Sequence, residues 1–155
     1  MILMNRKRLL ALPILLFVLP ISGSSSWADS PRTKCNIRID DPHISKSILR
    51  RYGYGAVKIN ARSKCNVPMS NLRLTVTIFK TGFLRNHEVR TFTFSKNELI
   101  PADVIIKNSD TWQKCITSRP TRYFGVATAT ALINGKLVRT PKAVTEKSVV
   151  LPCGT

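Results

Sequence analysis

Acidic side chains and histidines are scarce in this sequence. Its 155 residues include eight Asp and Glu residues and two histidines, His43 and His87. General acid–base catalysis and metal binding depend largely on carboxylates and imidazoles. The chain also lacks a Gly-x-Ser-x-Gly nucleophile elbow and a glycine-rich phosphate loop. We therefore expect a protein that is not an enzyme, with no cofactor, no metal site and no catalytic residue.

Long apolar runs are absent after the first 28 residues. Three cations at positions 6–8 precede an apolar stretch over residues 9–21, and small residues follow up to Ala28. This order is typical of a secretory signal peptide, and the stretch is shorter than the roughly 20 residues of a transmembrane helix. We expect residues 1–28 to be a signal peptide and residues 29–155 to form one secreted domain, extracellular or periplasmic. The alternative is an uncleaved segment that tethers the protein to a membrane.

The four cysteines, Cys35, Cys65, Cys115 and Cys153, all follow the predicted signal peptide. Their spacings match no zinc-binding pattern, whereas four cysteines in an exported chain are typical of two disulfides. We favour Cys35–Cys65 and Cys115–Cys153, because each pair brackets one predicted hairpin. Crossed pairings remain open from the sequence.

Strand signals recur along the whole exported segment. Residues 72–78 alternate strictly between apolar and polar side chains, which predicts a strand with one buried face. Asn134-Gly135 predicts a two-residue hairpin turn, and Pro141 predicts a break in its return arm. The chain contains about seven such segments and no long helical pattern. This indicates an all-β fold, an antiparallel, immunoglobulin-like β-sandwich, with a β-barrel as the alternative.

With these features together, the chain resembles the small secreted β-sandwich proteins with two disulfides found in bacteria, especially actinobacteria. The resemblance rests on the signal peptide, on Cys35 and Cys65 around an Asp-Pro-His turn, and on Cys115 with the final Cys153-Gly154. It implies export and architecture. It implies no particular activity and no functional residues.

The charge balance is the strongest hint of function. The formal net charge is +17, and residues 1–28 contain three basic residues and no acidic one, so +17 less three leaves +14 after cleavage. Such a charge favours anionic partners: a cell-surface polymer, a lipid or an acidic protein. Nucleic acid is a further alternative, without a supporting motif.

The basic loops are the expected binding sites. Residues 46–54 interleave cations with tyrosines, which suits stacking on rings beside anionic groups. A second loop places Phe83 and Leu84 between Lys80 and Arg85, an apolar tip suited to an exposed contact. The candidate binding residues are Lys46, Arg50, Arg51, Tyr52, Tyr54, Lys114, Arg119 and Arg122.

These observations favour a secreted, basic, non-enzymatic binding protein. One alternative is a secreted effector that inhibits an external enzyme or acts as a toxin through a disulfide-braced loop. Another is a small hydrolase that uses His43 or His87.

The exported protein is expected to begin at Asp29 and to contain two disulfides. Intact mass spectrometry tests both points, because the unreduced mass should match residues 29–155 with four hydrogens missing, and reduction should restore them. An unprocessed N-terminus would favour the tethered alternative, and an unchanged mass on reduction would contradict the disulfides.

Overall fold

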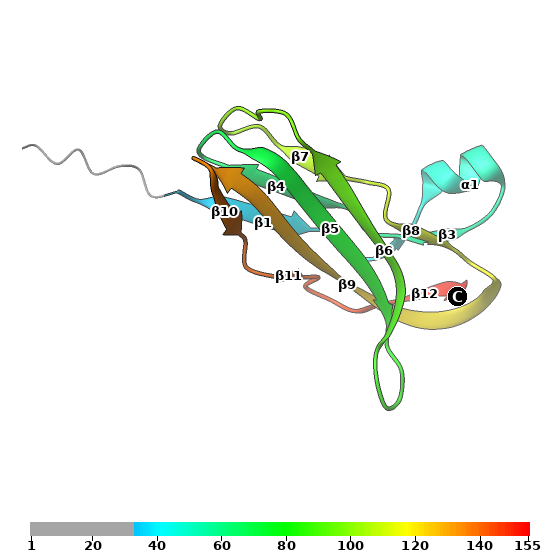
Figure 1. The fold of residues 1–155 in the computed structure, drawn as a ribbon. Coiled ribbons are helices and arrows are strands. Elements are labelled where there is room, and N and C mark those ends of the chain that lie inside the picture. The colour runs from blue at the N-terminus through cyan, green and yellow to red at the C-terminus, as the bar shows by residue number, and fades with distance from the viewer. Residues whose placement is uncertain (1–32) are drawn as a thin grey trace, which may run out of the picture. The chain divides into compact units, whose positions relative to one another are not determined.

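The computed structural model describes residues 33–155, which fold mainly into antiparallel strands (Figure 1). One short helix, α1 (Lys46–Tyr52), interrupts them. The predicted signal peptide lies outside the described residues. Within the described part of the chain, no helix is long and apolar enough to cross a membrane.

One layer of the sandwich consists of three chain passes, each broken once. Its strands are β1 (Cys35–Ile39), β2 (His43–Ile44), β3 (Ala56–Lys58), β4 (Ala61–Cys65), β7 (Ile106–Asn108) and β8 (Trp112–Lys114). The two halves run in the same order, β1-β4-β7 and β2-β3-β8. Backbone N–H groups bridge the break, from Asp40 to the Asn60 carbonyl (2.9 Å) and from Ile59 to the Thr111 carbonyl (3.1 Å). The two halves therefore act as one interrupted three-stranded sheet.

The other layer is built around the longest strand. Its strands are β5 (Ser70–Lys80), β6 (His87–Lys96), β9 (Thr117–Ile133), β10 (Lys136–Arg139), β11 (Ala143–Val144) and β12 (Val149–Gly154). Their order is β10-β9-β5-β6, and β11 and β12 continue the return arm along β9. Four passes here and three in the first layer make an antiparallel, immunoglobulin-like sandwich of seven passes. The sheets do not close into a barrel.

The hairpin that ends β9 forms as the sequence predicts. Asn134 and Gly135 have φ values of 50° and 73°, the positive values that a type I′ turn requires. Ile133 pairs directly with Lys136 across this two-residue turn. The return arm breaks near Pro141, where β10 ends at Arg139 and β11 begins at Ala143.

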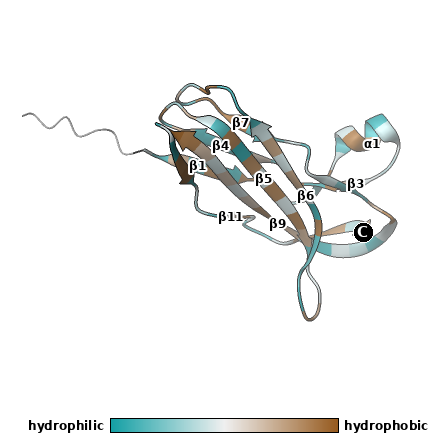
Figure 2. Cartoon of the chain, viewed as in Figure 1, coloured by the Kyte–Doolittle hydropathy of each residue, from teal (hydrophilic) through white to brown (hydrophobic). Residues whose placement is uncertain are grey.

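The core lies between the two layers, on the inward face of each alternating strand. Hydrophobic and hydrophilic residues alternate along β5 in Figure 2, and Leu72, Leu74, Val76 and Ile78 are fully buried. Gly125 of β9 marks a close approach of the layers. A Cβ atom there would lie 2.5 Å from Cδ1 of buried Ile59, in the opposite sheet. A larger residue at this position would therefore crowd the core.

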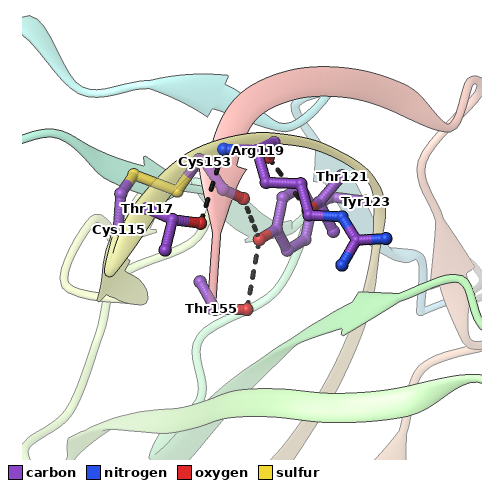
Figure 3. The surroundings of a disulfide bond; sticks show 7 residues. All are labelled: Cys115, Thr117, Arg119, Thr121, Tyr123, Cys153 and Thr155. Atoms are coloured by element: carbon purple, nitrogen blue, oxygen red, sulfur yellow. Dashed lines mark hydrogen bonds between the residues drawn. A yellow bond between two sulfur atoms is a disulfide. The ribbon is translucent and has the colours of Figure 1, made fainter.

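Both predicted disulfides form, with the favoured pairing. Cys35–Cys65 joins directly opposed residues of β1 and β4. Cys115–Cys153 joins the connection between β8 and β9 to β12. Beside it, the hydroxyl of buried Tyr123 donates to the Cys153 carbonyl (2.5 Å) and lies 3.1 Å from the Thr155 hydroxyl (Figure 3). The C-terminal strand is thus held by a covalent bond and by hydrogen bonds.

A buried amide connects the layers. The Asn108 side chain is fully buried and donates to the carbonyls of Leu74 (2.9 Å) and Phe92 (3.1 Å) in the four-stranded sheet. Its oxygen accepts from the Asp110 backbone N–H (3.3 Å) and from the Thr111 hydroxyl (3.1 Å). Both polar atoms of the amide group are thereby engaged, as buried polar groups require.

Asn108→Ala should lower the free energy of unfolding by about 3 kcal/mol, because it removes these hydrogen bonds and leaves buried partners without a donor or acceptor. Urea unfolding followed by circular dichroism measures the loss. Asn97→Ala is the control, since Asn97 is exposed and should change stability by less than about 0.5 kcal/mol. Equal stability of the two variants would contradict the proposed role.

Candidate functional site

Three cations face one another across the outer surface of the three-stranded sheet. Arg38 pairs with Arg62, and Arg62 pairs with Lys107. All three are exposed. We call them the basic row. Directly opposed like charges destabilise a sheet by some tenths of a kcal/mol per pair, so this arrangement works against the stability of the fold.

A shallow hollow of about 400 Å³ lies over this surface. Its lining residues are Lys34, Asn36, Arg38, Arg62, Ser63, Lys64, Asn66, Asp103 and Ile105. Two carboxylates offset part of the charge, with Asp40 3.5 Å from Arg62 and Asp103 2.8 Å from Lys64. These ion pairs are solvent-exposed and contribute little to stability. Cations still outnumber the acids here.

An aromatic cluster occupies the other half of the same layer. The ring centroids of Tyr52 and Tyr54 are 5.7 Å apart, and each lies 6.5 Å from the Trp112 ring. Two cations lie over these rings. The Lys114 amine is 4.5 Å from the Tyr54 centroid, and the Arg51 guanidinium is 6.0 Å from the Tyr52 centroid. We call these three rings the aromatic cluster.

Helix α1 positions the two tyrosines through its ends. The Ser45 hydroxyl accepts from the Ile48 backbone N–H (3.4 Å), which caps the first turn. Gly53 has φ 74° and donates its N–H to the Leu49 carbonyl, which ends the helix. Buried Ile48 fixes the inward face of the helix. Tyr52 is therefore the last helical residue, and the chain turns immediately so that Tyr54 stacks beside it.

The basic row and the aromatic cluster share one sheet surface. Lys58 pairs directly with Trp112 in one half of the layer, and it precedes Arg62 along the same pass. A second hollow of about 270 Å³ is lined by Arg51, Tyr52, Lys58, Trp112 and others. From Lys58 to Lys64 the pass extends about 20 Å at the usual rise per residue. The surface is therefore elongated, basic at one end and aromatic at the other.

The structure brings together only part of the set predicted from the sequence. Lys46, Arg50, Arg51 and Tyr52 lie on α1, and Tyr54 and Lys114 meet beside them. Arg119 and Arg122 instead line a separate groove of about 540 Å³, together with Lys80, Ile116, Thr155 and others. The predicted loop residues thus belong to two sites.

The sequence-based predictions looked for binding residues in loops and therefore missed the basic row. Its residues stand at the outward positions of alternating strands, in Asn-Ile-Arg38-Ile and Ala-Arg62-Ser-Lys64, where a solvated face is the ordinary interpretation. The signal was available in those outward positions. The sequence does not show the order of the strands in the sheet. Only that order places Arg38, Arg62 and Lys107 side by side.

The two histidines lie in different sheets. His43 is in β2, where a ring nitrogen is 3.1 Å from the Asp41 carbonyl, and His87 is exposed at the start of β6. Among residues 33–155, no three His, Cys, Asp or Glu side chains are grouped as metal ligands would be.

No protein-family model matches this chain, and no curated protein sequence is significantly similar to it. The β fold and the two disulfides agree with the resemblance to small secreted proteins at that level.

Trp112 offers a direct optical test of the aromatic cluster, because it is the only tryptophan after residue 28. Tyr52→Ala should remove one ring that covers the indole, so the emission of processed protein should shift to longer wavelength and acrylamide should quench it more strongly. Tyr52→Phe keeps the ring and should leave both measurements unchanged. Unaltered emission from Tyr52→Ala would show that Tyr52 does not shield Trp112.

Proposed function

We propose that this protein is secreted and acts as a non-enzymatic binding protein for an anionic polysaccharide at a cell surface. The polymer would lie along the outer surface of the three-stranded sheet, from the basic row to the aromatic cluster. The single observation that carries the proposal is the direct cross-strand opposition of Arg38, Arg62 and Lys107.

The basic row supports an anionic ligand on energetic grounds. The repulsion between opposed cations is present in the free protein and is relieved when an anion lies between them. Three guanidinium and ammonium groups across neighbouring strands suit repeated anionic groups rather than a single small anion. Because these side chains are exposed, their contribution to binding should weaken as salt screens the charges.

The aromatic cluster supports a ligand with rings. Tyr52 is half exposed, at 52%, and Trp112 is partly exposed beside it. Aromatic faces provide a surface on which flat or ring-shaped groups pack, and the neighbouring cations add affinity for charge. A charged polysaccharide offers both groups in one chain. Single-stranded nucleic acid offers them too, and the experiment below separates the two ligands.

Export supports a ligand outside the cell. Disulfides persist in oxidising compartments, and the two in this fold suggest such a compartment. The signal-peptide pattern of residues 1–28 suggests how the chain reaches it.

The triple substitution Arg38→Gln, Arg62→Gln and Lys107→Gln should weaken binding to dextran sulfate about tenfold, because it removes three exposed charge contacts. Affinity electrophoresis through gels that contain dextran sulfate measures the change, with neutral dextran as the reference. Added salt should reduce the retention of the unsubstituted protein.

A matched control separates site binding from overall charge. Arg73→Gln, Arg90→Gln and Lys136→Gln remove the same number of exposed charges from the four-stranded sheet and should retain most of the affinity. Equal losses in the two triple variants would contradict a specific site. Tighter binding of single-stranded DNA than of dextran sulfate would reassign the ligand to nucleic acid.

A further inference from the structure

The hairpin between β5 and β6 ends in an apolar tip. Phe83 is 102% exposed and Leu84 is 91% exposed, and they are adjacent in the chain. In Figure 1 the loop extends well beyond the rest of the sandwich. Large apolar side chains held this far into water gain nothing for the fold, so their position suggests a contact with another phase or molecule.

The loop has a closed base. Lys80 pairs with His87 across the hairpin, and the Thr81 N–H donates to the Arg122 carbonyl of β9 (2.9 Å). At Gly82 a Cβ atom would collide with the Arg85 carbonyl and would lie 3.0 Å from the His87 ring. The chain therefore turns back tightly just beyond the base, and the tip is presented on a braced support.

Cations lie within this loop and at its base. Arg85 is exposed within the loop, and the groove of about 540 Å³ at the base is lined by Lys80, Arg119 and Arg122. Ile116, 77% exposed, lines the same groove. We call the four cations Lys80, Arg85, Arg119 and Arg122 the basic collar.

Among the described residues, no Asp or Glu side chain forms an ion pair with a cation of the basic collar. The Lys80 amine donates to a backbone oxygen of Thr155 (2.6 Å), and an Arg122 nitrogen donates to the Ser148 hydroxyl (3.4 Å). The nearest acid along the hairpin, Glu88, accepts from the Thr91 hydroxyl (2.8 Å). The collar therefore places positive charge at the base of a loop with an apolar tip.

We propose that this hairpin docks on an anionic lipid bilayer, with Phe83 and Leu84 entering the interface and the basic collar meeting lipid phosphates. A protein partner fits less well, because stable protein interfaces bury about 800 Å² on each side and a tip of two side chains covers much less. A bilayer can take up a single small apolar tip, and its anionic lipids attract the cations nearby. This surface is separate from the polymer site and does not depend on it.

The test compares two double variants of the processed protein, because the apolar stretch over residues 9–21 of the full chain would itself partition into vesicles. Phe83→Ser with Leu84→Ser should lower partitioning into phosphatidylglycerol-containing vesicles by at least about tenfold, because two apolar side chains no longer enter the interface. Leu99→Ser with Leu137→Ser removes two other exposed apolar side chains, 72% and 58% exposed, and should leave partitioning nearly unchanged. Vesicle co-sedimentation measures both.

A second measurement locates the tip in the membrane. Phe83→Trp should add an emission component that shifts to shorter wavelength on mixing with the anionic vesicles, whereas Leu137→Trp should not. Equal partitioning of the two double variants, or equal binding of the unsubstituted chain to anionic and to pure phosphatidylcholine vesicles, would overturn the proposal. The positions substituted in the vesicle experiment lie outside the polymer site. The outcome of the dextran sulfate experiment therefore does not decide the outcome of the vesicle experiment.

Discussion

The side chain of Asn108 is the constraint on which the arrangement of the three-stranded sheet depends. Its amide nitrogen is tied to the carbonyls of Leu74 and Phe92, and its oxygen holds Asp110 and Thr111. Those last two residues lie in the break between β7 and β8. One buried amide thus joins the layers and holds the interruption that separates Lys107, in the basic row, from Trp112, in the aromatic cluster. The geometry of the proposed polymer site depends on a residue that does not belong to it.

Much of the fold follows from local sequence signals. The alternation of residues 72–78 correctly predicted a strand with one buried face, and Asn134-Gly135 correctly predicted a two-residue turn with positive φ. Bracketing of hairpins by cysteines predicted both disulfides. These features succeed because each is decided by neighbours in the chain or by simple hairpin geometry.

The candidate site was predicted less well, for a physical reason. The grouping of Tyr52, Tyr54 and Lys114 was anticipated in part, because the tyrosines adjoin one another in sequence. The alignment of Arg38, Arg62 and Lys107 depends on which strands are neighbours, and segments far apart in the sequence carry no local mark of that pairing. Whether Arg119 and Arg122 join the cations of α1 could not be predicted for the same reason, and they line the groove at the base of the β5–β6 hairpin.

The broken return arm bears on how the protein behaves at high concentration. A continuous strand at the edge of a sheet presents a row of free N–H and C=O groups that can template a strand from another molecule. Here the arm beside β9 is divided into β10, β11 and β12, and Pro141 and Pro152 contribute no N–H groups. That side of the four-stranded sheet is therefore a poor template for cross-β growth, and this limits one route to aggregation.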